Sequence, residues 1–392
     1  MEPSVFLDTE TRSHFPLDFS IVQILSKKWE VTLFGSFDKI KEMKKEIQKK
    51  GMEPRNVFFL EKKERIPAWT VSQRLKNLQI ARQDVRNLRE AMEKKENPFL
   101  LITSFSNNLY ALCLSSLLRD IPSACFLHNI RDWVNIPGIP NPSSKKRVFS
   151  NRRVLKNLGG VFFIEEYLRK NAQRWIRKPG YVFPFRLSRM AELKLREQTI
   201  QGNPVPSFVV PGIVSSKSRD YDSVFAVFSD IRENFRLIFL GAVKEPQIVE
   251  EGKKLLGERL VTFENYLEEE EFQKHLLSSH FLIGSVKEGL YGEYQGSGVE
   301  FDGPTIGIPT IIRASLFPQN ENGFFLRYNS IEEEKEIVRK GIKSIQNKTY
   351  MEIYQNPAFE KAADFLEEKW EKQLEVDIRN VIEERRAKRG AL

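Results

Sequence analysis

Short apolar segments with the composition of buried strands alternate with segments of helical periodicity along nearly the whole chain, and this alternation occurs twice. In the first half, strands are predicted at residues 4–9, 30–35, 56–60, 99–103, 123–127, 160–164 and 181–184, and helices at 17–28, 38–50, 69–95, 109–118, 148–158 and 166–176. A strand, a helix and a second strand in succession favour a parallel sheet with right-handed crossovers. The first half therefore predicts a Rossmann-like α/β domain.

The alternation starts again after residues 186–207, which contain glycine and prolines and are predicted to be a linker. The second half has predicted strands at 208–210, 236–240, 260–263, 281–284 and 310–312, and helices at 222–231, 247–256, 268–278 and 331–346. The chain of 392 residues suits two domains of ordinary size. We expect an α/β protein with Rossmann-like domains at 1–200 and 207–348, and charged C-terminal helices at 350–392, for which packing back on the first domain is one arrangement.

Composition excludes several classes of protein. No window reaches the roughly 18–20 uncharged apolar residues that a membrane-spanning helix needs, and the first residues lack the basic flank and cleavage site of a signal peptide. Cys113 and Cys125 each lie in an apolar run, as buried free thiols of a reducing cytoplasm do. With only 4 scattered histidines, no metal site is predicted. We therefore expect a cytoplasmic protein.

The net charge of +9 is concentrated between residues 145 and 178, where Glu165 and Glu166 alone oppose 11 basic side chains. A solvated basic face, an anionic membrane surface and nucleic acid are three interpretations of this stretch. The sequence has no recognisable nucleic-acid-binding module, so nucleic acid is not predicted as a partner. Because residues 69–95 also carry arginines beside an apolar face, we expect the first domain to dock on anionic lipid as a peripheral protein.

A glycine-rich stretch in the second half predicts an anion site. Gly296, Ser297 and Gly298 follow a predicted buried strand, and a helix is expected to begin at Val299. Glycines let a ligand approach the backbone closely, and the N–H groups that open a helix attract phosphate. The stretch therefore indicates one unit of a nucleotide-binding α/β domain.

Other candidate residues follow predicted strands. Lys217 and Arg219 come soon after Gly212, and cations there would stabilise the charge of a leaving diphosphate, although a surface Lys/Arg pair is the simpler interpretation. Asp302 is a candidate for accepting hydrogen bonds from sugar or ribose hydroxyls. The alternative is that its negative charge compensates the positive end of a helix dipole. His128 follows a strand at the edge where ligands bind, or is a core histidine.

Taken together, these motifs resemble the glycosyltransferase-B fold, and within it the large family 4-like group of retaining glycosyltransferases. Three segments carry the resemblance: residues 210–221 with Gly212, Lys217 and Arg219, residues 302–311 with Asp302 and the Gly-Ile-Pro sequence, and the Leu-His-Asn sequence at 127–129. Several features depart from the family: the second donor-loop acid is Asp302, and the loop at residues 10–16 has no glycine pair. The family's first donor-loop acid would fall at Tyr294, one position after Glu293, and Ile213 stands in place of an arginine.

The resemblance implies a retaining transfer from a nucleotide-sugar donor to a glycan or lipid-linked acceptor, without a metal or other cofactor. It assigns catalytic roles to His128 and Asp302. Donor contacts are assigned to Gly212, Lys217, Arg219, Asn265, Tyr266, Glu293, Gly296, Ser297 and Gly298, and an acceptor-side loop to Thr11, Arg12 and Ser13. Asn265 and Tyr266 are equally consistent with a plain turn. A nucleotide-sugar epimerase and a non-catalytic protein that binds a partner or glycan are the alternatives.

Overall fold

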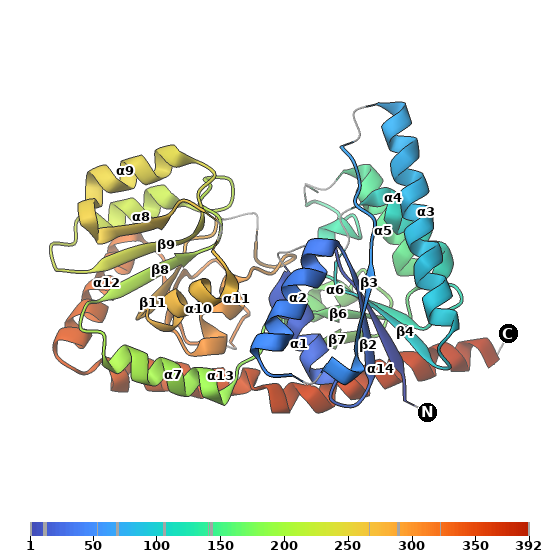
Figure 1. The fold of residues 1–392 in the computed structure, drawn as a ribbon. Helices are drawn as coiled ribbons and strands as arrows, with labels where there is room; N and C mark the ends of the chain where they lie inside the picture. Colours follow the sequence, from blue (N-terminus) through green and yellow to red (C-terminus); the bar gives the residue numbers. More distant parts are fainter. Residues whose placement is uncertain are drawn as a thin grey trace. The chain divides into compact units, whose positions relative to one another are not determined.

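The structure, a computed structural model, describes residues 2–10, 14–52, 54–67, 70–104, 107–139, 141, 144–265, 267–287, 291–321 and 323–390. Contacts divide the chain into two compact units. Unit 1 comprises Met1–Phe185 with Trp370–Leu392, and unit 2 comprises Arg186–Lys369. Each unit is an α/β domain built on one parallel sheet (Figure 1).

Unit 1 contains a seven-stranded sheet in the order β3-β2-β1-β4-β5-β6-β7. Every pair of neighbouring strands is parallel. The strands are β1 (Ser4–Asp8), β2 (Glu30–Gly35), β3 (Val57–Glu61), β4 (Pro98–Ile102), β5 (Ser123–Phe126), β6 (Gly160–Phe163) and β7 (Gly180–Val182). All seven strands predicted for the first half are thus confirmed, and the strand order reverses between β1 and β4.

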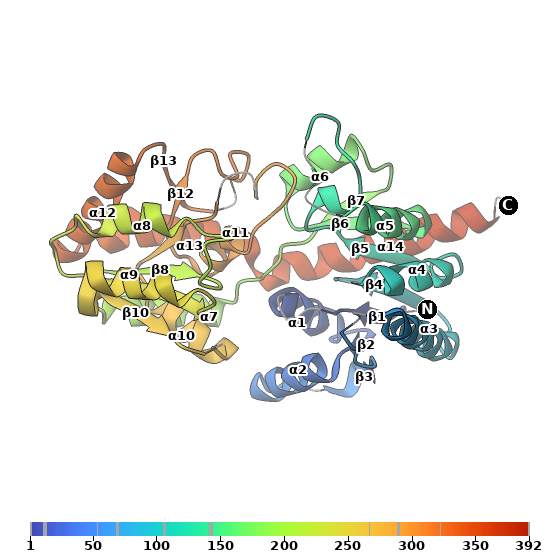
Figure 2. The same cartoon turned by 90° about the horizontal axis from the view of Figure 1, so that it is seen from above.

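The helices of unit 1 begin at the capping residues that the sequence provides. Ser36, Asn107 and Ser144 accept hydrogen bonds from the first-turn N–H groups of α2, α4 and α5, and Thr70 with Gln73 forms a capping box on α3. The helices are α1 (Phe15–Leu25), α2 (Phe37–Lys49), α3 (Val71–Glu93), α4 (Asn108–Leu117), α5 (Lys145–Asn157) and α6 (Glu166–Gln173). Helices α3, α4 and α5 lie side by side (Figure 2).

The C-terminal helix α14 (Glu367–Gly390) runs, from Trp370 onward, along the amino-terminal edge of this sheet. Glu375 pairs with Lys28 just before β2, at 2.7 Å, and Arg386 donates to Asn97 just before β4, at 2.8 Å. A Cβ atom on Gly160, the first residue of β6, would lie 2.8 Å from a Val381 methyl group. The loops at the opposite, carboxyl-terminal edge of the sheet are therefore not covered by these contacts.

Unit 2 contains a six-stranded parallel sheet in the order β10-β9-β8-β11-β12-β13. Its strands are β8 (Ser207–Pro211), β9 (Arg236–Ala242), β10 (Leu260–Phe263), β11 (Phe281–Gly284), β12 (Thr310–Arg313) and β13 (Phe325–Tyr328). The sequence did not predict β13, because this edge strand is partly exposed, contains Arg327 and lacks the continuous apolar run of its neighbours. The strand order reverses between β8 and β11.

Unit 2 also contains helices on both sides of its sheet. They are α7 (Met190–Gln201), α8 (Tyr221–Phe228), α9 (Pro246–Leu256), α10 (Glu269–Leu277), α11 (Val299–Asp302), α12 (Ile331–Gln346), a π-helical turn (Met351–Gln355) and α13 (Asn356–Ala362). In the part of the chain that the structure describes, no helix combines the length and the apolar character needed to cross a membrane.

The predicted linker at 186–207 is wrong, since most of it forms α7. Arg196 on this helix is fully buried, and its Nη1 donates to the carbonyl oxygens of Leu277 and Ser279 at 2.9 and 2.8 Å. Its Nη2 donates to Gln355 Oε1 at 2.9 Å. The buried face of this helix contains Arg196 between Leu193 and Ile200, so its apolar periodicity is weak. The first domain accordingly ends at Phe185 rather than near 200, and the segment 350–392 is divided between the units.

Candidate functional site

In open parallel sheets, ligands bind outside the carboxyl ends of the strands, at the point where the strand order reverses. Unit 2 has this point between β8 and β11, and unit 1 has it between β1 and β4. The predicted donor residues Gly212, Lys217 and Arg219 follow β8, and His128 follows β5, next to β4.

The loop after β8 depends on Gly212. Its φ of +101° is strained for any other residue. Arg219 folds back over it and donates from Nη2 and Nε to the Pro211 carbonyl oxygen, at 2.8 and 3.2 Å. A Cβ atom on Gly212 would meet Nη2 of Arg219 at 2.7 Å. Arg219 therefore braces the loop, and glycine is required beneath it.

The two loops at the reversal point of unit 2 are joined by their backbones. The N–H of Asp220 donates to the carbonyl oxygen of Ser285, after β11, at 2.8 Å, and the N–H of Lys287 donates to that of Ser218 at 3.2 Å. Lys217 lies in this joined segment with an exposed side chain. Its ammonium group forms no ion pair with any residue that the structure describes. This lysine is thus a cation available to a ligand.

Beside Lys217, a carboxylate is bound in a cradle that the sequence did not reveal. Glu245, in the loop after β9, accepts hydrogen bonds from Ser215 Oγ at 2.5 Å, from Ser216 Oγ at 2.6 Å and from the Ser216 N–H at 3.0 Å. The Ser215 and Ser216 hydroxyls hold the pKa of Glu245 below its usual value. Two hydroxyls and an N–H are the donors that bind phosphate oxygens. The adjacent serines before Lys217 were the available signal.

The glycine-rich loop after β11 differs from expectation. Helix α11 begins at Val299, as predicted, but it is a single turn of 4 residues. The N–H of Ser297 is already used, because it donates to Glu300 Oε2 at 2.9 Å. Glu300 is fully buried and also accepts from Asn320 Nδ2 at 2.8 Å. The Ser297 amide is therefore part of an internal network, and an open helix N-terminus does not form here.

The acidic candidates of this loop lie close to the glycines. Asp302 ends α11, and its Oδ1 lies 4.0 Å from Nη1 of the buried Arg186. A Cβ atom on Gly298 would be 3.4 Å from Asp302 Oδ2, so these two positions are adjacent. Glu293 is exposed on a tight turn, in which the Gly292 N–H donates to the Gln295 carbonyl oxygen at 2.9 Å. Gly296 directly follows this turn.

Asn265 is exposed after β10, the edge strand, which β9 separates from β8. Within the described residues, no hydrogen bond or ion pair joins it to Lys217. Tyr266 lies outside the described residues, and so does the predicted acceptor-side loop of Thr11, Arg12 and Ser13.

In unit 1, His128 lies against the end of β4. Its Nε2 is 3.1 Å from the carbonyl oxygen of Thr103. A carbonyl can only accept, so Nε2 donates, and the neutral ring keeps Nδ1 as an acceptor. The ring of His14 lies 4.1 Å away, tilted by 37°. Burial lowers the pKa of both histidines, and this keeps them neutral near pH 7. His14 was missed, and its place after the first predicted strand was the only signal.

A buried ionic network lies at the carboxyl end of β1. Asp8, at the end of β1, pairs with Lys62 and accepts from the Tyr110 hydroxyl at 2.7 Å. Asp18 pairs with Lys39 at 2.8 Å, and these two ion pairs are almost completely excluded from water. Buried charges are tolerated only when they are paired and hydrogen-bonded, as here. The network therefore fixes the edge of the sheet on which His14 and His128 lie.

Two parallel α/β domains, each with its loops at a reversal point of the strand order, define the glycosyltransferase-B fold. The chain is similar to sucrose-phosphate synthase from Thermosynechococcus elongatus, with 13% identity over 97% of this chain and 99% of that one and a TM-score of 0.64. It is similar to Anabaena HepE in complex with UDP and glucose, with 13% identity, coverage of 95% and 98% and a TM-score of 0.63. It is also similar to UDP-GlcNAc 2-epimerase from Neisseria meningitidis, with 12% identity, coverage of 96% and 99% and a TM-score of 0.59. No protein-family model and no curated protein sequence matches the chain.

Proposed function

We propose that this protein is a glycosyltransferase that takes its sugar from a nucleotide-diphosphate donor. The observation that carries the proposal is the loop after β8, where an exposed Lys217 stands beside two serines that already hold a carboxylate. These groups lie at the reversal point of a parallel sheet, where nucleotides bind. The similar Anabaena protein, described with UDP and glucose, supports the same interpretation.

Negative charge develops on the leaving diphosphate as the glycosidic bond breaks. Lys217 and the Gly296 and Gly298 amides would stabilise that charge in fixed positions, and the hydroxyls of Ser215 and Ser216 would join them once the phosphate displaces Glu245. Arg219 is committed to the Pro211 carbonyl, so we assign it to the shape of the loop more than to the diphosphate. We expect the reaction to need no metal or other cofactor.

At the sugar, we assign His128 to the reacting ring and Asp302 to a sugar or ribose hydroxyl. The neutral His128 has Nδ1 as an acceptor for a hydroxyl group, while Nε2 is held by Thr103. We propose that transfer proceeds with retention, with a leaving phosphate oxygen taking the proton of the acceptor hydroxyl. The acceptor, a glycan or a lipid-linked sugar, would bind at the edge of unit 1.

Calorimetry with UDP, GDP and ADP, followed by incubation with the matching nucleotide sugars, tests the proposal. One nucleotide should bind, and Lys217→Ala should lower the affinity for it. Lys253→Ala, at an exposed lysine on α9, should leave that affinity unchanged. His128→Ala should lower turnover more than donor affinity. Binding of no nucleotide, or equal binding by the wild type and Lys217→Ala, would contradict the donor assignment.

A nucleotide-sugar epimerase is the second candidate, because UDP-GlcNAc 2-epimerases have the same fold as this chain at TM-scores of 0.58 and 0.59. NMR of the reaction mixture separates the two. A transferase releases nucleotide diphosphate when an acceptor is present, whereas an epimerase changes the sugar of the donor. A protein that binds nucleotide but gives neither product would be a non-catalytic binder. Tyr294 favours a non-catalytic binder, because the family that the sequence resembles has an acidic residue at this position.

A further inference from the structure

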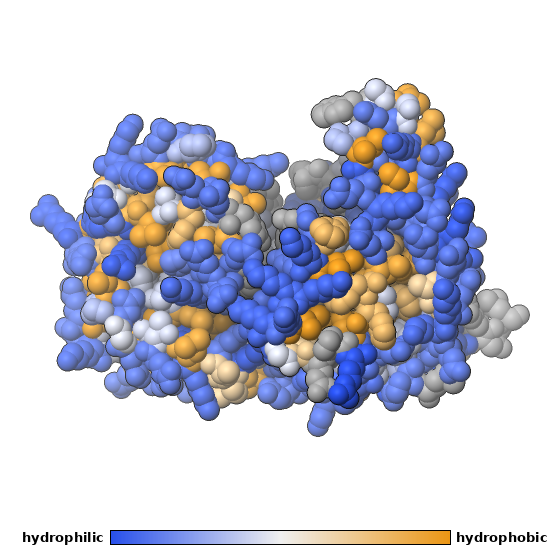
Figure 3. All heavy atoms as spheres, in the orientation of Figure 1, coloured by the Kyte–Doolittle hydropathy of each residue, from blue (hydrophilic) through white to orange (hydrophobic). Residues whose placement is uncertain are grey.

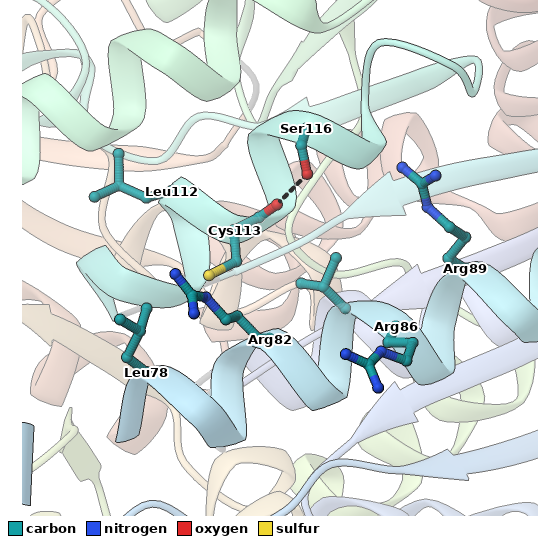
Figure 4. A pocket seen from close by; sticks show the side chains of 8 residues that line it. Leu78, Arg82, Arg86, Arg89, Leu112, Cys113 and Ser116 are labelled. Atoms are coloured by element: carbon teal, nitrogen blue, oxygen red, sulfur yellow. Dashed lines mark hydrogen bonds between the residues drawn. The ribbon is translucent and has the colours of Figure 1, made fainter. Parts of the chain in front are cut away.

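Two adjoining hollows lie along α3 in unit 1. The larger, of about 930 Å³, lies among the first turns of α3, α4 and α5, and the smaller, of about 520 Å³, continues between α3 and α4. Leu78 and Leu112 line both, so the hollows form one groove, which we call the α3–α4 groove. Figure 4 shows its smaller part, with Arg82 of α3 beside Cys113 of α4 and with Arg86 and Arg89 farther along α3.

The larger end of the groove exposes apolar side chains to solvent. Val71, Leu75 and Phe149 are exposed by 72%, 56% and 57%, and all three line the same hollow. Apolar and hydrophilic atoms are mixed at the projecting end of α3 (Figure 3). Single exposed apolar residues need no explanation, but a group that lines a hollow with a polar rim marks a binding surface.

The rim of the groove is basic. Its charged residues are Arg74, Arg82, Arg86, Arg89, Lys145 and Lys146, and none of the described residues that line it is acidic. Arg89 has a partner, Asp120, at 3.5 Å. Among the described residues, the other five basic side chains form no ion pair. Their charge is therefore uncompensated beside an apolar floor.

Some basic side chains of the stretch at 145–178 have partners within the protein, and two others belong to the rim of the groove. Arg147 pairs with Asp132 at 2.7 Å, and Arg169 pairs with Glu166 at 2.5 Å. Lys178 donates to the backbone carbonyl oxygens of Lys156 and Leu158. Of this stretch, Lys145 and Lys146 join the arginines of α3.

We propose that the α3–α4 groove and its rim dock unit 1 on a lipid bilayer that contains anionic phospholipid. The arginines and lysines would contact lipid phosphates, and Val71, Leu75 and Phe149 would enter the boundary between head groups and acyl chains. The exposed aliphatic side chains favour lipid over nucleic acid, which binds to aromatic platforms in a basic groove. The attraction acts within about 8 Å at physiological ionic strength, so it requires direct contact and weakens as salt rises.

The groove also lies at a specific edge of unit 1. Val71 begins the helix that follows β3, Asn107 follows β4, and Lys145 begins the helix that follows β5. His128 follows β5 at the same carboxyl-terminal edge. Docking would therefore bring the edge that contains His128 close to the membrane surface. This proposal does not depend on the proposed function, because it concerns lipid binding alone.

Vesicle co-sedimentation tests the proposal with the full chain. The vesicles are phosphatidylcholine alone, or phosphatidylcholine with about a third of phosphatidylglycerol, each at low and at physiological salt. One variant reverses the charge of the rim by replacing Arg82, Arg86, Lys145 and Lys146 with Glu. A matched control makes the same replacement at four exposed basic residues of unit 2, namely Arg232, Arg236, Lys253 and Lys254. A second variant replaces Val71, Leu75 and Phe149 with Ser. Its control replaces three similarly exposed apolar residues elsewhere with Ser, namely Leu255, Ile353 and Val376.

The wild type should pellet with anionic vesicles only, and less at higher salt. The groove reversal should lower the partition coefficient by at least about a thousandfold, because four contacts of about 1 kcal/mol each are lost and replaced by repulsion, whereas the unit 2 reversal should change it much less. The serine variant should lower binding and its control should not. Equal pelleting with neutral vesicles, none with either, or equal loss in a groove variant and its control would overturn the proposal. Binding of duplex RNA that only the groove reversal abolishes, without vesicle binding, would identify a nucleic-acid surface instead.

Discussion

Ser216 holds the carboxylate of Glu245 with two hydrogen bonds, one from its backbone N–H at 3.0 Å and one from its hydroxyl at 2.6 Å. The two residues come from loops that follow neighbouring strands, β8 and β9. A third bond, from Ser215, completes a set of donors around one anion. The chain therefore supplies its own carboxylate at the place where we propose that a donor phosphate binds.

Replacing Glu245 with Ala should tighten the binding of nucleotide diphosphate. The substitution frees three donors and removes a negative charge near Lys217, and a gain of about 1 kcal/mol would lower the Kd roughly fivefold. Calorimetry measures it, and Glu250→Ala, at an exposed acid on α9, the helix that follows Glu245, is the control for net charge. Weaker binding in Glu245→Ala would mean that Glu245 shapes the loop for the ligand rather than competing with it.

Replacing Lys217 and replacing Arg219 should have different effects on stability and on nucleotide affinity. Lys217 is exposed and unpaired among the described residues, so Lys217→Ala should keep the wild-type Tm and lose nucleotide affinity. Arg219 donates twice to the Pro211 carbonyl, so Arg219→Ala should lower stability by about 1.5–3 kcal/mol, as hydrogen bonds from charged groups do. Thermal unfolding and calorimetry on both variants provide the test. A large loss of Tm in Lys217→Ala would show that the lysine is structural.

Acid should destabilise unit 2 through His280. Burial lowers the pKa of this histidine to about 3, and its ring is hydrogen-bonded to Ser207 at 2.9 Å. The unfolded chain binds a proton below its pKa of about 6.5, whereas the folded one stays neutral, so stability is complete above that pH and falls as the pH drops. Between pH 7.5 and 5 this single group should cost roughly 2 kcal/mol.

Urea unfolding of His280→Asn at these two pH values measures that contribution. The variant should show a smaller pH dependence than the wild type. His275→Gln, at a partly exposed histidine of the same unit, should leave most of the dependence in place. An unchanged slope in His280→Asn would assign acid sensitivity to other groups, of which the half-buried pair His14 and His128 acts in the same direction.

Arg196→Met should destabilise unit 2 strongly. The buried guanidinium satisfies the carbonyl oxygens of Leu277 and Ser279, which methionine would leave without a donor. Each buried unsatisfied group costs about 1–3 kcal/mol, so we expect a loss of about 3 kcal/mol or more. Lys194→Met, an exposed position on α7, is the matched control and should be close to neutral. A stable Arg196→Met protein would show that α7 is held by its apolar contacts instead.

The sequence determined the α/β class and most of the elements, because buried parallel strands and amphipathic helices each produce a local pattern of apolar residues. It also located the loops after β5, β8 and β11 as candidate sites, since a ligand-binding loop follows the end of a strand. The prediction of elements failed where a helix or strand has no clear apolar pattern. Helix α7 is anchored by Arg196, and β13 is a short, partly exposed edge strand.

Only the tertiary structure decided which side chains meet. Glu245 lies 29 residues from Ser216 in the chain, and His14, which follows the first strand, lies against His128, which follows the fifth. The Ser297 amide was expected to face a ligand but is held by Glu300, a contact made possible by a single helical turn. Strand order and loop closure bring such distant residues together, and neither leaves a mark in the local sequence.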